Sequence, residues 1–430
     1  MMSFKTFPVI LRVSGSAVLL AVSIAGCDVS GLLDVSDPSR LLSEDVEVPA
    51  QASALMNGLE ADFLCAQGAF MVIQAAFSDE FEDHSASGDV WTLDRRRPQN
   101  VDNWGDNDCT ALVPSVYLPA GRSRWVADNL VTLLSGWTDA EVASRTERIA
   151  RANLYAGFSA SMIGMTNCTA ALDVGPEMTQ ADMFAAAASR FTAALSGGGS
   201  EITNAARVGR ARVRLFMGDT GGALTDAQAV PAGFVMNIQP SNGTSRLYNR
   251  IWEKNLFANS QGVPPWTRNL EVDGVPDPRM VSVDTGEDTG WGPGNNRPGG
   301  GTVWAQVKFT AANTPIPIAR YAEAQLIIAE ISGGQTAVAI INALRGPLGL
   351  PVFASTVEAD IQAEVARERR HELFLEGFRM YDIRRLGLPL IPAVGTPYQP
   401  GVKGGTYGDQ TCIPIPVIET FNNPNFRSGT

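Results

Sequence analysis

The chain has 430 residues, and 45% of them are hydrophobic, which is enough to bury one large core or two ordinary ones. Charged residues make up 18% of the chain, a composition that excludes a disordered polyelectrolyte. The 33 basic and 45 acidic side chains leave a net charge of −12, which argues against nucleic acid as a partner because phosphate recognition needs clustered cations.

The first 26 residues have the pattern of an export signal. Two cations, Lys5 and Arg12, precede a weakly apolar run of about 14 residues that ends in small side chains at Gly26. The run is too short to span a bilayer, which needs about 20 apolar residues. We expect residues 1–26 to be a signal peptide, with a short N-terminal anchor helix as the alternative.

The string Ser-Ile-Ala-Gly-Cys at residues 23–27 resembles a bacterial lipobox, although Ile24 stands where leucine is preferred. The resemblance implies a thioether-linked lipid on Cys27, and an anchor of two or three acyl chains holds a protein stably on a membrane. Residues 27–49 are then a lipidated tether. No later segment approaches about 18 uncharged apolar residues, so we expect membrane contact through the lipid anchor only.

Four further cysteines follow, and their spacing matches no zinc site. An even number of thiols in an exported chain permits two disulfides, in any of three connectivities. Free buried thiols are the alternative. These cysteines are Cys65, Cys109, Cys168 and Cys412.

Between residues 50 and 230, apolar side chains recur at helical spacing. Small residues such as Ala187, Ala206 and Gly209 stand where paired helices would approach closely, as in tetratricopeptide repeats. The pattern predicts a tetratricopeptide-like helical part over 50–230, with a long loop at 85–114. The expected helices cover 50–84, 116–135, 140–165, 181–195 and 202–217, and another ends at Pro231.

An acidic cluster closes the first of these helices. Its carboxylates could bind calcium, but the glycine turn of a calcium loop is missing, so we interpret the cluster as a solvated helix end. No metal site is predicted. The cluster consists of Asp79, Glu80, Glu82 and Asp83.

The helical period vanishes between residues 231 and 316. Residues 264–301 hold 8 glycines and 6 prolines among 38 residues, and such an unpatterned insertion in a helical array is typical of a binding surface or a flexible tip. Its glycines form no phosphate-binding motif, because no Gly-Lys-Ser/Thr follows them. We expect 231–316 to be an irregular ligand-binding insertion.

Helical pattern returns at Pro317 and extends, with interruptions, to about Arg385. Ser355 and Glu358 have the spacing of a capping box for the last long helix. Prolines at positions 389, 392, 397 and 400 exclude a helix beyond it.

The stretch RERRHELFLEGFRMYDIRR at 367–385 resembles the C-terminal signature of the SusD/RagB family, and INALR at 341–345 and CIPIPVIE at 412–419 are similar to further segments of that family. The resemblance implies a mainly α fold of about four tetratricopeptide-like units, with 317–430 as the signature-bearing part. It also implies a lipoprotein of the outer membrane that acts as a lid on a TonB-dependent, SusC-like transporter barrel. Such proteins capture oligosaccharides or peptides and perform no chemistry, so neither a catalytic residue nor a cofactor is expected.

The charged residues of the signature are interpreted as a structural ion network. On one continuous helix, Glu368, Glu372 and Glu376 would stand four residues apart, with arginines interleaved between them. Direct contact with a ligand is the alternative. The network comprises Glu368, Arg369, Arg370, Glu372, Glu376, Arg379, Asp382, Arg384 and Arg385, with His371 as a hydrogen-bonding member.

The ligand site is expected on the tryptophan-bearing loops, because sugar rings stack on exposed indoles while amides, carboxylates and guanidinium groups bind the hydroxyls. Trp125, Trp137 and Trp252 fall in helical patterns and are expected in the core. In the family, the loop between the first two long helices carries part of the site, and this resemblance is regional. Indoles that plug loops onto the core are the alternative. The expected site residues are Trp91, Asn103, Trp104, Asp106, Trp266, Trp291 and Trp304.

Two other functions stay open at this point. A tetratricopeptide scaffold on the cell envelope that binds protein partners would show a smooth helical groove without the tryptophan-bearing insertion. An acid-pair glycosidase needs two placed carboxylates, and the sequence singles out no pair. Any histidine-based triad would have to use His84 or His371, since the chain has only these two histidines.

Overall fold

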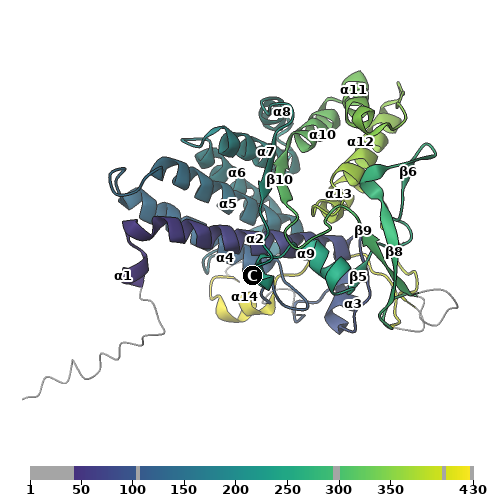
Figure 1. Cartoon of the computed structure of the whole chain (residues 1–430), viewed down its shortest axis with the longest axis horizontal. Coiled ribbons are helices and arrows are strands. Elements are labelled where there is room, and N and C mark those ends of the chain that lie inside the picture. The colour runs from purple at the N-terminus through teal and green to yellow at the C-terminus, as the bar shows by residue number, and fades with distance from the viewer. Residues whose placement is uncertain (1–42, 103–106, 294–300, 400–402, 427–430) are drawn as a thin grey trace, which may run out of the picture. The chain divides into compact units, whose positions relative to one another are not determined.

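The structure is a computed structural model that describes residues 43–102, 107–293, 301–399 and 403–426. Helices dominate these residues (Figure 1), so the expectation of a mainly α chain is confirmed. A short helix, α1 (Ser43–Val46), belongs to a separate N-terminal unit, and residues 47–430 form one compact unit. Its helices are α2 (Ala52–Phe77), α3 (Gly88–Asp94), α4 (Tyr117–Gly136), α5 (Arg145–Thr166), α6 (Gln180–Ala194), α7 (Ser200–Phe216), α8 (Thr220–Gln228), α9 (Arg250–Trp252), α10 (Tyr321–Ser332), α11 (Gly334–Arg345), α12 (Glu358–Glu372), α13 (Arg379–Leu386) and α14 (Val417–Asn422).

The helices α2, α4, α5, α6, α7 and α8 pack as an array in which each lies beside the next, and α3 lies outside this array (Figure 1). The ring of Phe191 in α6 shows why small residues stand at the crossings. It lies between Gly157 of α5 and Gly209 of α7, where an added Cβ would come within 2.8 Å and 2.5 Å of the ring. Helix pairs of the tetratricopeptide type stack only where such close approaches are possible.

The stretch between α8 and α10 leaves the order of the array, and its two ends meet at one strand pair. Strand β4 (Val235–Ile238) pairs antiparallel with β10 (Ile316–Arg320), so the two ends of the excursion are held together. The excursion itself is irregular, as expected for 231–316, whereas the division of the chain into functional parts stays a prediction. Its strands are β5 (Gln261–Gly262), β6 (Glu271–Val272), β7 (Val275–Pro276), β8 (Ser282–Asp288) and β9 (Thr302–Gln306), and a π-helical turn, η4, covers Glu253–Phe257.

The remaining strand pairs are short and antiparallel. β1 (Glu82–Asp83) pairs with β5, β2 (Thr169–Ala170) pairs with β3 (Met178–Thr179), and β8 pairs with β9. The β1–β5 pair joins the loop after α2 to the insertion across some 180 residues of chain.

The prediction of one long helix up to Arg385 is wrong. α12 ends at Glu372, and the chain turns before α13 begins at Arg379. The turn needs left-handed backbone at Leu375 (φ 58°) and Gly377 (φ 91°), and Gly377 also lies against the ring of Phe70, where a side chain has no room.

Two local predictions also differ from the structure. The capping box does not form: Val357 is the N-cap residue of α12, and Glu358 instead accepts the backbone N–H of Gly334. The expected loop at 85–114 contains α3, whose Val90 and Leu93 are buried. In both places tertiary contacts override the local signal.

Two disulfides are formed, and they select one of the three connectivities. Cys65 pairs with Cys109, and Cys168 pairs with Cys412. The second bridge fastens the C-terminal stretch to the end of α5, next to the pairing of Asn167 with Ile413. No described helix is both long enough and apolar enough to cross a membrane.

Candidate functional site

The acidic cluster after α2 is buried rather than solvated, so its interpretation as a solvated helix end is wrong. Asp79, Glu80, Glu82 and Asp83 are each 1–3% exposed. Such carboxylates need nearby cations or a proton, because an unpaired charge is costly inside a protein. Both occur between residues 79 and 83, where one carboxylate is paired with cations and another is protonated.

Asp79 is the ionised member. Arg379 donates two hydrogen bonds to its carboxylate, at 2.7 and 2.8 Å, and Arg370 lies 3.3 Å away. Burial by itself would raise the pKa of Asp79, but the hydrogen bonds and charge of Arg379 outweigh it, and the pKa is lowered.

Glu80 is the protonated member. Its carboxyl accepts the backbone N–H of Leu375 at 3.2 Å and faces no cation as closely as Asp79 does. Burial, assisted by the charge of Asp79, raises the pKa of Glu80 to about 8. The side chain is therefore mainly neutral at pH 7.

The carboxylates of β1 reach other parts of the chain. Arg268 donates to Glu82 at 2.8 Å, and Lys403 forms an ion pair with Asp83 at 2.5 Å. Asp94 of α3 accepts the N–H of Asp83, and burial raises its pKa to about 7. The loop after α2, the insertion and the C-terminal stretch are thereby joined.

Above this buried layer lie two tryptophans that we call the tryptophan face, Trp91 of α3 and Trp291 after β8. Their ring centroids are 6.4 Å apart with the planes inclined by 31°, and Trp291 is 44% exposed. The ammonium of Lys403 lies 5.5 Å from the Trp91 ring, and the Trp91 indole N–H donates to the Ser85 carbonyl. Segments 200 residues apart thus present two indoles together.

The other expected site residues are placed differently. Trp304 is half-buried against the core with the guanidinium of Arg268 over its ring at 4.6 Å, and Trp266 is half-buried as well. Asn103, Trp104 and Asp106 lie outside the described residues. Of the tryptophans expected in the core, Trp137 packs against it, but Trp125 is 56% exposed, so that prediction is wrong for Trp125. A helical pattern alone does not fix which face of α4 is covered.

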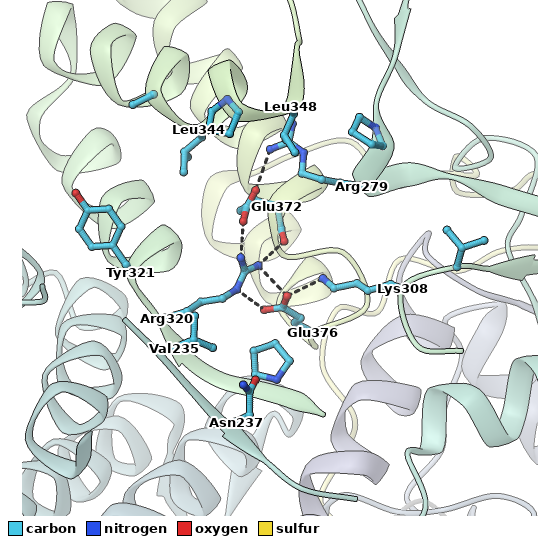
Figure 2. Close-up of a pocket in the computed structure, with 15 residues that line it drawn as sticks. Val235, Asn237, Arg279, Lys308, Arg320, Tyr321, Leu344, Leu348, Glu372 and Glu376 are labelled. Carbon is cyan, nitrogen blue, oxygen red and sulfur yellow. Dashed lines mark hydrogen bonds and ion pairs between the residues drawn. The ribbon is translucent and has the colours of Figure 1, made fainter. Parts of the chain in front are cut away.

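The charged residues of the signature pair mainly with distant segments, and the pairs within the signature meet at Asp382. Glu372 and Glu376 both bind Arg320 (Figure 2), Arg369 and Arg385 bind Asp382, and Arg384 donates to the carbonyls of Met165 and Thr411. His371 hydrogen-bonds Asp277 at 2.8 Å. The partners are as follows: Glu368 with Arg279 and Arg345, Glu372 with Arg279, Glu376 with Lys308, Arg370 with Asp79 and Thr267, Arg385 with Glu330.

Sequence reasoning missed several partners, chiefly Arg268, Arg279, Lys403 and Tyr398. Tyr398 donates to Asp94 at 3.0 Å across 304 residues of chain, and no local pattern marks such a contact. Metal-capable side chains come together in the described residues only at Cys65, Asp108 and Cys109, where the disulfide occupies both thiols.

Comparisons of the sequence and of the fold with known proteins both find similarity to SusD-type proteins. The model of the SusD family matches residues 248–411. A SusD superfamily protein from Bacteroides vulgatus superposes with a TM-score of 0.66 at 17% identity, covering 89% of this chain and 100% of the other. A SusD-like carbohydrate binding protein from Bacteroides fragilis gives 0.65 at 15% identity, covering 88% and 99%.

A SusD superfamily protein from Parabacteroides distasonis gives a TM-score of 0.62 at 13% identity, covering 91% of this chain and 100% of the other. These likenesses establish the fold and confirm the tetratricopeptide-like helical architecture. No curated protein matches the chain. Residues 248–411, which include the signature, thus match the SusD family model, and the chain shares the fold of SusD superfamily proteins over nearly its whole length, so both findings support the resemblance to the SusD/RagB family.

Proposed function

We propose that this protein captures an oligosaccharide, with a peptide as the lesser candidate, and delivers it to a TonB-dependent transporter in the outer membrane. The tryptophan face carries the proposal. Trp91 and Trp291 come from different segments and lie side by side, with Trp291 44% exposed and Trp91 half-buried. Exposed indoles offer apolar faces for sugar C–H groups.

The surroundings of the face suit polyols. Asp288 is exposed at the end of β8, and the backbone N–H of Trp291 is held by the Thr289 hydroxyl at 3.3 Å. Lys403 is fixed by Asp83 beneath the face. A rigid support of this kind lowers the ordering cost of binding. A solved relative named as a SusD-like carbohydrate binding protein supports the same ligand class.

Alanine substitution tests the face directly. Trp291→Ala and Trp91→Ala should each weaken oligosaccharide binding by one to two orders of magnitude, about 1–3 kcal/mol at 1.4 kcal/mol per decade. Trp125→Ala is the matched control, because Trp125 is exposed on α4, away from the face. Isothermal titration against a glycan panel measures the change. Wild-type affinity in both face variants would place the site elsewhere.

The anchor and the transporter belong to the same proposal. Cys27, which lies outside the described residues, is proposed to carry the lipid, so Cys27→Ala should release the protein into the periplasm. Gentle detergent extraction of the unaltered chain should co-purify a large β-barrel protein. Membrane fractionation of the Cys27→Ala chain at high salt would contradict the anchor, and recovery of the monomer alone in several detergents would contradict the partner.

Binding without bond cleavage is part of the proposal. Incubation with oligosaccharides or peptides should release no products, which chromatography of the mixture measures. Product release would favour the glycosidase alternative, whereas retention of protein partners without any glycan binding would favour the scaffold.

A further inference from the structure

A cavity of about 610 Å³ lies on another side of the molecule, between β10, α10, α11 and the end of α12. Figure 2 shows Tyr321 and Leu344 along one wall and Arg320, Glu372, Glu376 and Lys308 gathered opposite them. The volume is in the range of sites that bind small molecules, and such sites combine apolar walls with a few placed polar groups. The apolar wall residues are Val235, Pro278, Val307, Leu344, Pro347 and Leu348.

The polar side of the cavity is an ion cluster in which both carboxylates are neutralised. Lys308 lies 2.6 Å and Arg320 2.7 Å from Glu376, and Arg279 lies 3.0 Å from Glu372, which also binds Arg320. Each of the four carboxylate oxygens has a cation within hydrogen-bonding distance. The cluster therefore offers polar edges without an unpaired charge.

Tyr321 connects this cavity to a second hollow of about 710 Å³ along α10 and α11. The second hollow has a different character, because amide side chains from α8, α10 and α11 line it, among them Gln228, Gln325 and Gln335. The side-chain amides of Gln228 and Gln325 have no hydrogen-bond partner among the residues that the structure describes. One aromatic ring thus stands between an ion-paired hollow and an amide-lined hollow.

We propose that these two hollows form one groove that binds a neutral oligosaccharide across Tyr321, separately from the tryptophan face. A sugar hydroxyl both donates and accepts hydrogen bonds, so it can add to the edges of paired Arg320 or Glu372 without displacing a partner. The amides of Gln228 and Gln325 would take hydroxyls of the neighbouring sugars, while the Tyr321 ring supplies the stacking surface.

The paired charges disfavour the other ligand classes. A uronic acid or a peptide terminus would have to replace one partner of an ion pair whose members are largely buried, and breaking such a pair is strongly unfavourable. The chain's net charge of −12 also repels anions. No residue is shared with the tryptophan face, so this inference does not depend on the function proposed above.

The test uses the full chain in a sugar-free detergent, with Trp91→Ala and Trp291→Ala combined to disable the other site. The probes are neutral hexasaccharides of glucose, mannose and xylose, with hexagalacturonate and a pentapeptide as charged comparisons. Isothermal titration should detect at least one neutral hexasaccharide in this background. Adding Tyr321→Ala should weaken its binding at least about tenfold, whereas Tyr321→Phe should keep it within about threefold because the ring remains.

Two amides that line the second hollow, the exposed Gln228 and the half-buried Gln325, keep the test usable if Tyr321→Ala fails to fold. Gln228→Ala with Gln325→Ala should weaken binding at least about threefold at unchanged melting temperature, and Trp125→Ala should change nothing. Equal binding in the parent and in both sets of variants would overturn the proposal. So would binding of hexagalacturonate or the pentapeptide in preference to every neutral probe, or no binding of any neutral hexasaccharide. If the Trp91→Ala, Trp291→Ala chain binds the hexasaccharide as tightly as wild type and only the groove variants weaken binding, the earlier proposal alone is rejected.

Discussion

The helical array and the signature segment are both buried and helical, yet opposite kinds of contact hold them. In the array, α4 to α8 pack on their neighbours in sequence through apolar and small residues such as Phe191 and Gly209. In the segment from Glu358 to Leu386, which we call the ion-paired junction, charged side chains are buried and bind segments up to 300 residues away. The array stacks locally, whereas the junction fastens the two ends of the chain to the insertion.

The difference has an energetic consequence. Apolar packing is graded, because a smaller or larger side chain costs in proportion to the cavity or clash it creates. A buried ion pair is close to all-or-none, because the loss of one partner leaves the other charge buried and unpaired. The junction should therefore tolerate substitution less than the array does.

The largest expected effect is at the junction. Arg379→Met removes both hydrogen bonds to Asp79 and leaves Arg370 as its remaining cation, so the free energy of unfolding should fall by about 3–5 kcal/mol. Urea denaturation followed by circular dichroism measures this. The control is Arg151→Met on α5, a half-buried arginine whose partners Glu147 and Glu201 are exposed, so that its ion pairs should contribute less than about 1 kcal/mol. Equal losses in the two variants would remove the distinction between the regions.

A second expectation concerns pH. Because burial raises the pKa of Glu80 to about 8, the folded chain binds a proton there that the unfolded chain releases near pH 4.5. This group's contribution to stability is fully present below pH 4.5 and is lost as the pH rises through 8, by about 2 kcal/mol between pH 6 and pH 8.

Glu80→Gln isolates that contribution, since the amide oxygen can still accept the N–H of Leu375 but does not titrate. Relative to wild type, the variant should gain stability steadily from pH 6 to pH 8 in urea denaturation. Parallel pH profiles for the two proteins would show that Glu80 is ionised in the fold.

The smallest effects are expected inside the array. Gly209→Ala pushes a methyl group toward the Phe191 ring and should cost about 1–3 kcal/mol. Gly58→Ala on α2 meets no atom within 4 Å and should stabilise the protein by up to about 1 kcal/mol. Melting temperatures of the two variants should move in opposite directions, and a shared direction would contradict the packing at the crossing.

The sequence predicted the features that depend on neighbouring residues alone. Periodic apolar residues placed α4, α6 and α7 within about two residues of their observed ends, because each helix buries one stripe of its own side chains. The signature pointed to the SusD/RagB family without any structure, since a motif depends only on residue order, and the SusD family model matches residues 248–411, which contain it. The number of cysteines limited the disulfides to three connectivities but did not choose among them.

Tertiary structure decided the features that depend on contacts between segments far apart in the sequence. The sequence predicted a solvated helix end at the acidic cluster because the cations that pair with it are far away in the chain. Arg268, Arg379 and Lys403 lie 186 to 320 residues after the carboxylates they bind. The break at Leu375 and Gly377 interrupts a good helical pattern, because the backbone there turns to bring Arg379 onto Asp79. Trp125 and Trp291 are both exposed, although one lies in a helix and the other in a loop. Local pattern reports which side chains a segment can bury, but only the packing of other segments determines which of them it does bury.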